Sequence, residues 1–373
     1  MTKVFLDLAA PGIRGLKPYQ PGKPIAELER EYGVTDIVKL ASNENPLGPG
    51  PRALEAIAAA AGELARYPDA NSFELKRVLA ARHGVGTQCI TVGNGSNELL
   101  VLLAESFLRP GLQAVYSRHA FAVYALAVQA TGGEHRVADA LPAEHAQPFG
   151  HDLDAMAALV GPDTRLVFVA NPNNPTGTWL ASDALERFIA QLPPHVLVVV
   201  DEAYFEYVRE PDYPDASGWV ERYPNLVVTR TFSKAFGLAG MRIGYAVSSP
   251  EVAEILNRIR QPFNTSSLAQ AAALAALADV AHLARSVETN AAELQRVSRA
   301  CYELGLGVVP SVGNFLLVDM RTEARPVYEA LLREGVIVRP VANYGFPEHL
   351  RISIGTPAEN DRLLAALRQV IAA

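Results

Sequence analysis

The sequence has 373 residues, enough for one large α/β domain with an appendage or for two domains. Hydrophobic residues make up 49% and charged residues 20%, ordinary globular values that exclude a disordered chain, a collagen-like repeat and a coiled coil. The net charge is -7 and no basic run occurs, which argues against a nucleic-acid partner.

The cysteines and the apolar stretches restrict the class of protein further. Cys89 and Cys301 form no Cys-x-x-Cys pair, so neither a disulfide framework nor a thiolate metal site is predicted. The histidines take no metal-binding spacing such as H-E-x-x-H, and no metal is expected. No signal-like N-terminus and no apolar stretch near the roughly 18 residues that span a bilayer occur. We therefore expect a cytoplasmic protein without a membrane partner.

In chain order, residues 11–24 are rich in Pro and Gly and predict an extended arm held by another surface, followed by a short helix over 25–33. From Val38 to about Tyr245, apolar runs alternate with helical patterns. Continuous apolar runs indicate strands buried on both faces, as in a mostly parallel sheet between helices. Strands are predicted at TRLVFVANP, HVLVVVDEAY, NLVVTRTFSK and RIGYAV, and helices over 51–64, 72–83, 97–108, 152–160 and 182–191.

The pattern changes after Arg260. A helical stretch from about 267 to 304 precedes predicted strands near 315–319, 336–339 and 350–354 and a closing helix over 358–371. We therefore expect an α/β protein in three parts. These are an N-terminal arm (1–32) packed on the small domain or a partner subunit, a large domain (33–262) and a smaller α+β domain (263–373).

Three predicted strands end in polar clusters, at 171–177, 201–204 and 231–234. Ligands of open α/β sheets bind just outside the carboxyl ends of the strands, so we expect these clusters to form one crevice. Asp201 follows a buried strand, where an unpaired charge is costly, and a cationic or N–H group should face it. The alternative is an aspartate that caps the next helix.

A second set of residues suits a phosphorylated ligand. Lys234 lies among Gly, Ser and apolar residues, where burial would lower the pKa of its amine as Schiff-base chemistry requires; the alternative is an ordinary surface lysine. Ser233 and Arg242 suit a phosphate, and the turn at 93–98 leads into a helix N-terminus that favours anions. Neither a G-x-G-x-x-G nor a Walker sequence occurs. Pyridoxal 5′-phosphate, a small phosphorylated aldehyde with a basic ring nitrogen, fits this set.

The motifs resemble the class II aminotransferases of the fold type I pyridoxal phosphate superfamily, and most closely the histidinol-phosphate aminotransferase subfamily. The resemblance covers essentially the whole chain. It rests on LASNENPLGP (40–49), RYPD (66–69), GNGSNELL (93–100), NPNNPTG (171–177), VDEAYFEY (200–207), TFSKAFGLAGMRIGY (231–245) and LRISIGT (350–356).

The resemblance assigns roles around the cofactor. Lys234 would link covalently to it and move a proton, and Asp201 would pair with the ring nitrogen. Tyr204 and Asn174 would bond the phenolic oxygen, while the Phe121 ring would stack on the pyridine. The phosphate would be held by Ser96, Asn97, Ser233 and Arg242.

The resemblance also implies a homodimer with shared active sites, in which Tyr67 reaches the phosphate of the neighbouring subunit; the alternative is a turn tyrosine before a proline. Arg351 would clamp a substrate carboxylate. Arg339 and Tyr19 would hold the substrate phosphate, although Arg339 alone could form a rim salt bridge. Asn43, alternatively an Asx-turn residue, and Tyr344 would line the substrate pocket.

The implied reaction exchanges an amino group between L-histidinol phosphate and 2-oxoglutarate, giving imidazole acetol phosphate and L-glutamate by a reversible ping-pong route in histidine biosynthesis. An aromatic amino acid aminotransferase and a threonine-phosphate decarboxylase stay open, because the residues that bind the cofactor do not choose the substrate. A non-catalytic, pyridoxal-phosphate-sensing regulator is a remote alternative. It would need a DNA-binding extension, for which the N-terminal arm is too short and not basic enough.

Overall fold

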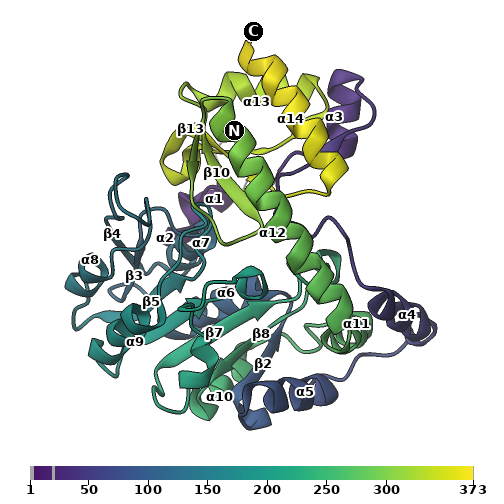
Figure 1. The fold of residues 1–373 in the computed structure, drawn as a ribbon. Helices are drawn as coiled ribbons and strands as arrows, with labels where there is room; N and C mark the ends of the chain where they lie inside the picture. The colour runs from purple at the N-terminus through teal and green to yellow at the C-terminus, as the bar shows by residue number, and fades with distance from the viewer. Residues whose placement is uncertain (1–3, 19–21, 373) are drawn as a thin grey trace.

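The computed structural model describes residues 4–18 and 22–372 and contains a large sheet and a small one, each with its own helices (Figure 1). The large sheet has seven strands in the order β2-β8-β7-β6-β5-β3-β4. Strands β4, β3, β5, β6 and β7 run parallel, and β8 runs antiparallel to both its neighbours, which confirms the mostly parallel sheet. The bounds are β2 (Ile90–Gly93), β3 (Gln113–Ser117), β4 (Glu134–Ala138), β5 (Thr164–Ala170), β6 (Leu197–Asp201), β7 (Leu226–Thr231) and β8 (Gly244–Ser248).

Helices cover both faces of the large sheet. Side chains alternate along each strand, so Val199 of β6 packs with one set of helices and Val198 and Val200 pack with the other. The first set includes α6 (Ser96–Phe107), α7 (Ala122–Thr131) and α10 (Pro250–Ile259). The second includes α8 (Leu153–Ala158) and α9 (Ser182–Gln191). The helices α7 and α10 are absent from the predicted set; α7 is apolar around most of its circumference and so shows little helical periodicity.

The small sheet is antiparallel, in the order β12-β13-β10-β9. It packs against α12, α13 and α14. A separate parallel pair joins β1 to β11, so the chain just before residue 41 lies with the small domain. The bounds are β1 (Val38–Lys39), β9 (Gly307–Val309), β10 (Phe315–Asp319), β11 (Val336–Ile337), β12 (Arg339–Val341), β13 (Phe346–Ser353), α12 (Val280–Glu303), α13 (Ala324–Arg333) and α14 (Pro357–Ala372).

The two sheets are joined by α11 (Ser267–Ala278) and α12, which meet at a bend of 78°. The buried alanines of α11 pack with α4 (Pro51–Ala60), α5 (Phe73–His83) and β2, on the side of the large sheet, whereas α12 runs up to the small sheet (Figure 1). The expected boundary near residue 262 precedes α11. We therefore propose that the large domain extends to the bend at Asp279.

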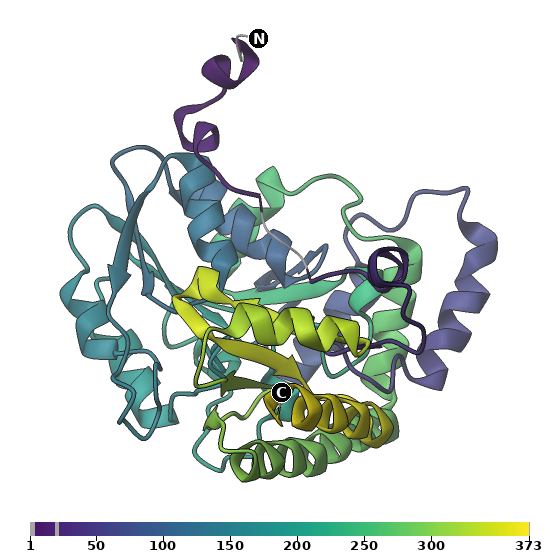
Figure 2. The ribbon, with the colours of Figure 1, turned by 90° about the horizontal axis from the view of Figure 1, so that it is seen from above.

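The N-terminal segment differs from the extended arm that was expected over 11–24. It contains α1 (Val4–Leu8) and α2 (Pro11–Arg14), and α2 begins at Pro11 because proline is well tolerated in the first turn of a helix. Figure 2 shows α1 standing away from the rest of the chain. The next helix, α3 (Ile25–Tyr32), buries Leu28 against Leu332 and Ile337 of the small domain.

Within the described ranges no single helix has the length and apolar character of a membrane span. The bent pair of α11 and α12 meets that test only when its two helices are counted together.

Candidate active site

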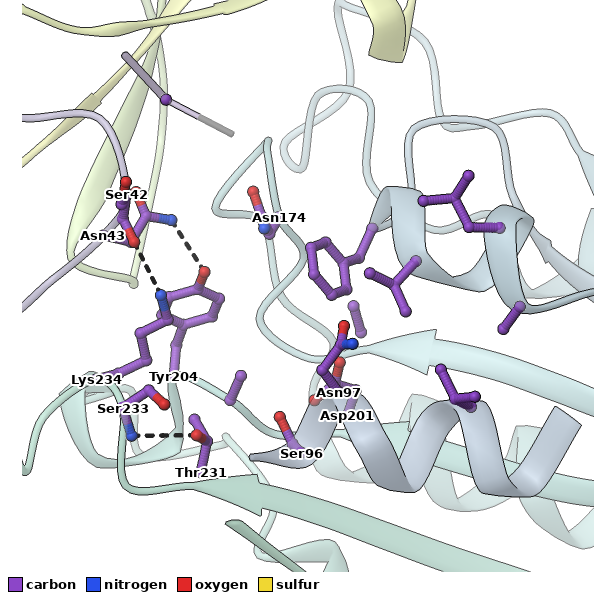
Figure 3. A pocket seen from close by; sticks show the side chains of 18 of the residues that line it. Ser42, Asn43, Ser96, Asn97, Asn174, Asp201, Tyr204, Thr231, Ser233 and Lys234 are labelled. Atoms are coloured by element: carbon purple, nitrogen blue, oxygen red, sulfur yellow. Dashed lines mark hydrogen bonds between the residues drawn. The ribbon is translucent and has the colours of Figure 1, made fainter. Parts of the chain in front are cut away.

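A cavity of about 690 Å³ opens where β5, β6 and β7 end. The last residues of these strands, Ala170, Asp201 and Thr231, all line it. Residues of the small domain, Arg339 and Arg351, line it from the other side, as does the segment that holds Ser42 and Asn43. The structure thus brings the three polar clusters into one crevice, and Figure 3 shows their side chains around it.

The Lys234 amine lies on the floor of this cavity. Its Nζ donates to the carbonyl oxygen of Ser42 at 3.0 Å and lies 5.6 Å from the centre of the Tyr204 ring (Figure 3). Burial lowers the pKa of the amine to about 7, and the positive charges of Arg351 and Arg242 act in the same direction. Much of the amine is therefore neutral and nucleophilic near neutral pH, the property that the apolar sequence around it predicted.

The Asp201 carboxylate, at the end of β6, is buried and held by two hydroxyl groups. Thr229 donates to Oδ1 at 3.1 Å and Tyr124 donates to Oδ2 at 2.9 Å. Burial raises the pKa of the carboxyl, whereas these hydrogen bonds act to lower it. The backbone N–H of Ala203 and the charge of Lys234 also act to lower this pKa, so the N–H group expected to face Asp201 is present.

Tyr124 was missed by the sequence analysis. It lies three residues after Phe121, at the start of α7, and the two rings meet edge to face with centroids 5.9 Å apart. Phe121 lines the cavity, so a tyrosine three positions further along the helix falls on the same side and reaches Asp201 behind it. This spacing is the signal that could have identified it.

An anion site lies at the N-terminus of α6. Ser96 and Asn97 form its first turn and line the cavity. Gly95 precedes them with φ +78°, and a Cβ there would lie 2.3 Å from Nη2 of Arg242, so the glycine admits the guanidinium. The Nη1 of Arg242 donates to the Ser233 hydroxyl at 3.2 Å. Backbone N–H groups, hydroxyls and a guanidinium thus converge as a phosphate would require.

Two arginines face each other on the small-domain wall. Arg339 of β12 and Arg351 of β13 are directly opposite each other in the antiparallel register, and both are buried. Arg351 donates from Nη1 to Oδ1 of Asn174 and from Nη2 to the carbonyl of Ala41, both at 2.6 Å. Its buried Nε has no acceptor within the described part of the chain. Both guanidinium groups line the cavity, and a guanidinium suits bidentate bonds to a carboxylate or a phosphate, so this wall suits a negatively charged substrate.

Asn174 is oriented by Arg351. A guanidinium can only donate, so the side-chain oxygen of Asn174 faces Arg351. Its NH₂ group is then left to donate to a ligand in the cavity.

The remaining four expected site residues lie in different places. Tyr67 is 82% exposed, stacks on Phe263 at 4.5 Å and lies outside the cavity lining. Tyr344 lines a neighbouring cavity of about 670 Å³, which shares Arg339 and Phe121 with the first. Asn43 lines the main cavity, and Tyr19 lies outside the described residues.

The chemistry of the donor set fits pyridoxal 5′-phosphate. The anion site suits its phosphate, the Asp201 carboxylate suits a protonated ring nitrogen, and the Lys234 amine suits its aldehyde. Asn174 and Tyr204 both line the cavity and suit the phenolic oxygen. No group of three or more His, Cys, Asp or Glu side chains within the described ranges could hold a metal ion.

Comparisons with known proteins agree over the whole length. A family described as aminotransferase class I and II matches residues 35–367. Histidinol-phosphate aminotransferase 2 of Pseudomonas aeruginosa is 58% identical over 370 residues, 99% of each chain. Histidinol-phosphate aminotransferase 1 of Nitrosococcus oceani is 54% identical over 368 residues, 99% of this chain and 98% of its own. The crystal structure of histidinol-phosphate aminotransferase from Sinorhizobium meliloti with pyridoxal-5′-phosphate has a TM-score of 0.89 and 34% identity, and 97% of both chains is covered.

Proposed function

The chain belongs to the class I and II aminotransferases, and from this premise we propose that it transfers the amino group of L-histidinol phosphate to 2-oxoglutarate with pyridoxal 5′-phosphate as cofactor. The products are imidazole acetol phosphate and L-glutamate, and the reaction is a step of histidine biosynthesis. The relatives named for this activity match the full chain at more than half identity, which supports the assignment.

When bound, the cofactor supplies an aldehyde that takes up the amino group and a protonated ring that accepts an electron pair. Lys234 would hold the cofactor through its amine, and the same amine would be the acid–base group at the substrate carbon. Asp201 keeps the ring nitrogen protonated. Arg242, Ser233 and the first turn of α6 fix the phosphate and with it the orientation of the ring.

The opposed pair Arg339 and Arg351 is the observation that carries the choice of substrates. Histidinol phosphate and glutamate differ in shape, but each carries two negative charges. Histidinol phosphate carries both on its phosphate, and glutamate carries one on each of its two carboxylates. Arg351 binds the carboxylate of glutamate, and Arg339 binds the phosphate of histidinol phosphate. One wall can therefore serve both halves of a ping-pong reaction.

The protein acts as a homodimer in the cytoplasm. Several apolar side chains between residues 54 and 73 are more than half exposed and would be covered by a second copy: Leu54, Leu64, Tyr67 and Phe73. Tyr67 is among them, and in the dimer it completes the phosphate site of the neighbouring subunit.

A stopped-flow half-reaction without keto acid tests the proposal. The yellow holoenzyme is mixed in turn with histidinol phosphate, phenylalanine and phosphothreonine, and the loss of absorbance gives a specificity constant for each. We expect histidinol phosphate to be preferred by at least about a hundredfold, which corresponds to roughly 2.7 kcal/mol of transition-state binding.

Two outcomes would overturn the choice of substrate. Faster bleaching by phenylalanine would indicate an aromatic amino acid aminotransferase, and release of carbon dioxide from phosphothreonine would indicate a decarboxylase. The cofactor chemistry would stand in both cases.

A further inference from the structure

The Asn43 side chain joins the small domain to Tyr204. Asn43 is 1% exposed and has φ +53°, a left-handed conformation that asparagine tolerates better than most residues. Its backbone N–H donates to the Ser353 hydroxyl at 2.8 Å, and its Nδ2 donates to the Tyr204 hydroxyl at 2.9 Å (Figure 3). The Ser353 hydroxyl in turn donates to Oδ1 of Asn43 at 2.9 Å. Asn43 therefore has a partner on each side of its amide.

The direction of each hydrogen bond follows from the backbone outward. A backbone N–H can only donate, so Ser353 accepts there, and its own proton goes to Oδ1 of Asn43. This fixes the amide with its NH₂ toward Tyr204, whose oxygen accepts. The single proton of the Tyr204 hydroxyl is then free to point into the cavity, which Tyr204 lines.

The tyrosine stays a neutral donor in this setting. Burial raises the pKa of Tyr204 to about 12, although the charge of Arg351 and the bond from Asn43 act to lower it. At neutral pH the hydroxyl therefore carries a proton, and Asn43 decides where that proton points.

Strand β13 carries both Ser353, which bonds Asn43, and Arg351. Arg351 and Ser353 are two residues apart on β13, so their side chains lie on one face of the strand. Arg351 donates to the carbonyl of Ala41 and Ser353 bonds Asn43, which fixes the segment 41–43 to β13 at two points. The position of the substrate-binding strand is thereby linked to the Tyr204 hydroxyl.

We propose that Asn43 is a positioning residue that, held by Ser353, keeps the Tyr204 hydroxyl turned as a proton donor toward the phenolic oxygen of the cofactor. This inference rests on the proposed function for the presence of the cofactor only, and not for the identity of the substrate. It gives Asn43 a role through Tyr204 in place of the substrate contact expected from the sequence.

The test is a pH titration of the visible absorbance of the holoenzyme without substrate. A hydrogen-bond donor stabilises the negative charge on the phenolic oxygen of the bound cofactor. Losing the donor therefore raises the midpoint pH at which the chromophore loses its proton. Tyr204→Phe removes the donor itself and should raise this midpoint by the largest amount. Asn43→Gly, which removes the amide but suits the positive φ, should raise the midpoint in the same direction by about one pH unit, the size expected for a hydrogen bond to a charged group.

Two further variants sharpen the test. Asn43→Asp replaces the NH₂ donor by an acceptor, which turns the Tyr204 proton away from the cofactor, and should shift the midpoint at least as far as Asn43→Gly. Ser353→Ala leaves the amide in place but removes the group that orients it, and should give a smaller shift of the same sign.

Asn290→Ala is the matched control, because it also removes a buried side-chain amide. The Asn290 amide donates to the backbone carbonyl of Gly313 and not to Tyr204. It should lower the thermal stability as Asn43→Gly does but leave the midpoint unchanged. An unshifted midpoint in Asn43→Gly, when Tyr204→Phe shifts it, would overturn the proposal. That result is independent of the substrate comparison, so the two proposals fail separately.

Discussion

The Tyr124 hydroxyl donates a hydrogen bond of 2.9 Å to Oδ2 of Asp201, and both side chains are buried. The Tyr124 ring is stacked on Phe168 of β5 with centroids 4.7 Å apart and an interplanar angle of 7°. The hydroxyl is therefore held in place by the sheet itself. It helps to keep a carboxylate charged in a setting where burial alone favours the neutral acid.

We expect Tyr124→Phe to raise the pKa of the Asp201 carboxyl further, because a donor to its charged form is lost. A neutral acid no longer holds a protonated ring nitrogen, so the acid limb of the kcat/KM profile should move to higher pH by about one unit. Tyr302→Phe, at an exposed hydroxyl bonded to the carbonyl of Val308, is the control. An unchanged acid limb in Tyr124→Phe would show that Tyr124 does not act on Asp201.

The lowered pKa of Lys234 sets the pH dependence of cofactor capture by the apoprotein. Only the neutral amine attacks an aldehyde, so the capture rate should rise through pH 7 and level off above it. It is measured from the growth of visible absorbance after mixing. A rate that keeps rising toward pH 10 would contradict a buried, desolvated amine.

The same shift affects the stability of the apoprotein. Between pH 7 and the ordinary value of 10.5 the unfolded chain binds the Lys234 proton and the folded chain does not. The contribution of this group to the free energy of unfolding therefore rises with pH across that window. Lys234→Ala should abolish amino transfer, keep the fold and remove this rise, as followed by urea unfolding at several pH values.

Gly95→Ala should weaken cofactor binding, because its Cβ would lie 2.3 Å from Nη2 of Arg242 and displace the guanidinium from the phosphate. Loss of a charge-assisted hydrogen bond predicts a dissociation constant roughly ten to a hundred times higher, measured by equilibrium titration. Gly111→Ala is the matched control: its φ of +88° imposes similar backbone strain, but nothing lies within 4 Å of the added atom. Equal losses in both variants would point to strain alone.

Arg339→Leu should reduce kcat/KM for histidinol phosphate by roughly ten- to a hundredfold, the value of one hydrogen-bonded charge pair. Activity with L-histidinol, which lacks the phosphate, should change little, so the preference for the phosphorylated substrate shrinks. Steady-state kinetics with the two compounds measures this. A parallel loss with both would place Arg339 outside the phosphate contact.

Mixing two inactive variants tests the shared active site. Tyr67→Ala and Lys234→Ala each leave every site of their own homodimer defective. In a mixed dimer one site combines an intact Lys234 with the Tyr67 of the other subunit and should regain activity after the subunits exchange. Continued inactivity, with exchange verified by mass, would exclude a Tyr67 that crosses between subunits.

Much of the fold could be predicted from the sequence because buried strands appear in it as continuous runs of apolar residues. The continuous valines of β6 have to be shielded on both faces, and they are. The largely apolar helix α7 gave little amphipathic signal, and the short helix α2 is set by a proline in its first turn and by contacts with α7. Those elements were therefore not found.

The sequence by itself determined the residues at the ends of the strands, since a parallel sheet brings its carboxyl ends to one edge whatever the details of packing. Asp201 and Lys234 could be chosen on that ground. Only the tertiary structure decided which hydroxyl meets Asp201 and which hydrogen bonds orient Tyr204. Asn43 and Ser353 are 310 residues apart in the chain, and their bond depends on the segment around Asn43 packing against β13. Hydrogen bonds are short and directional, and no periodic pattern in the sequence records such a pairing.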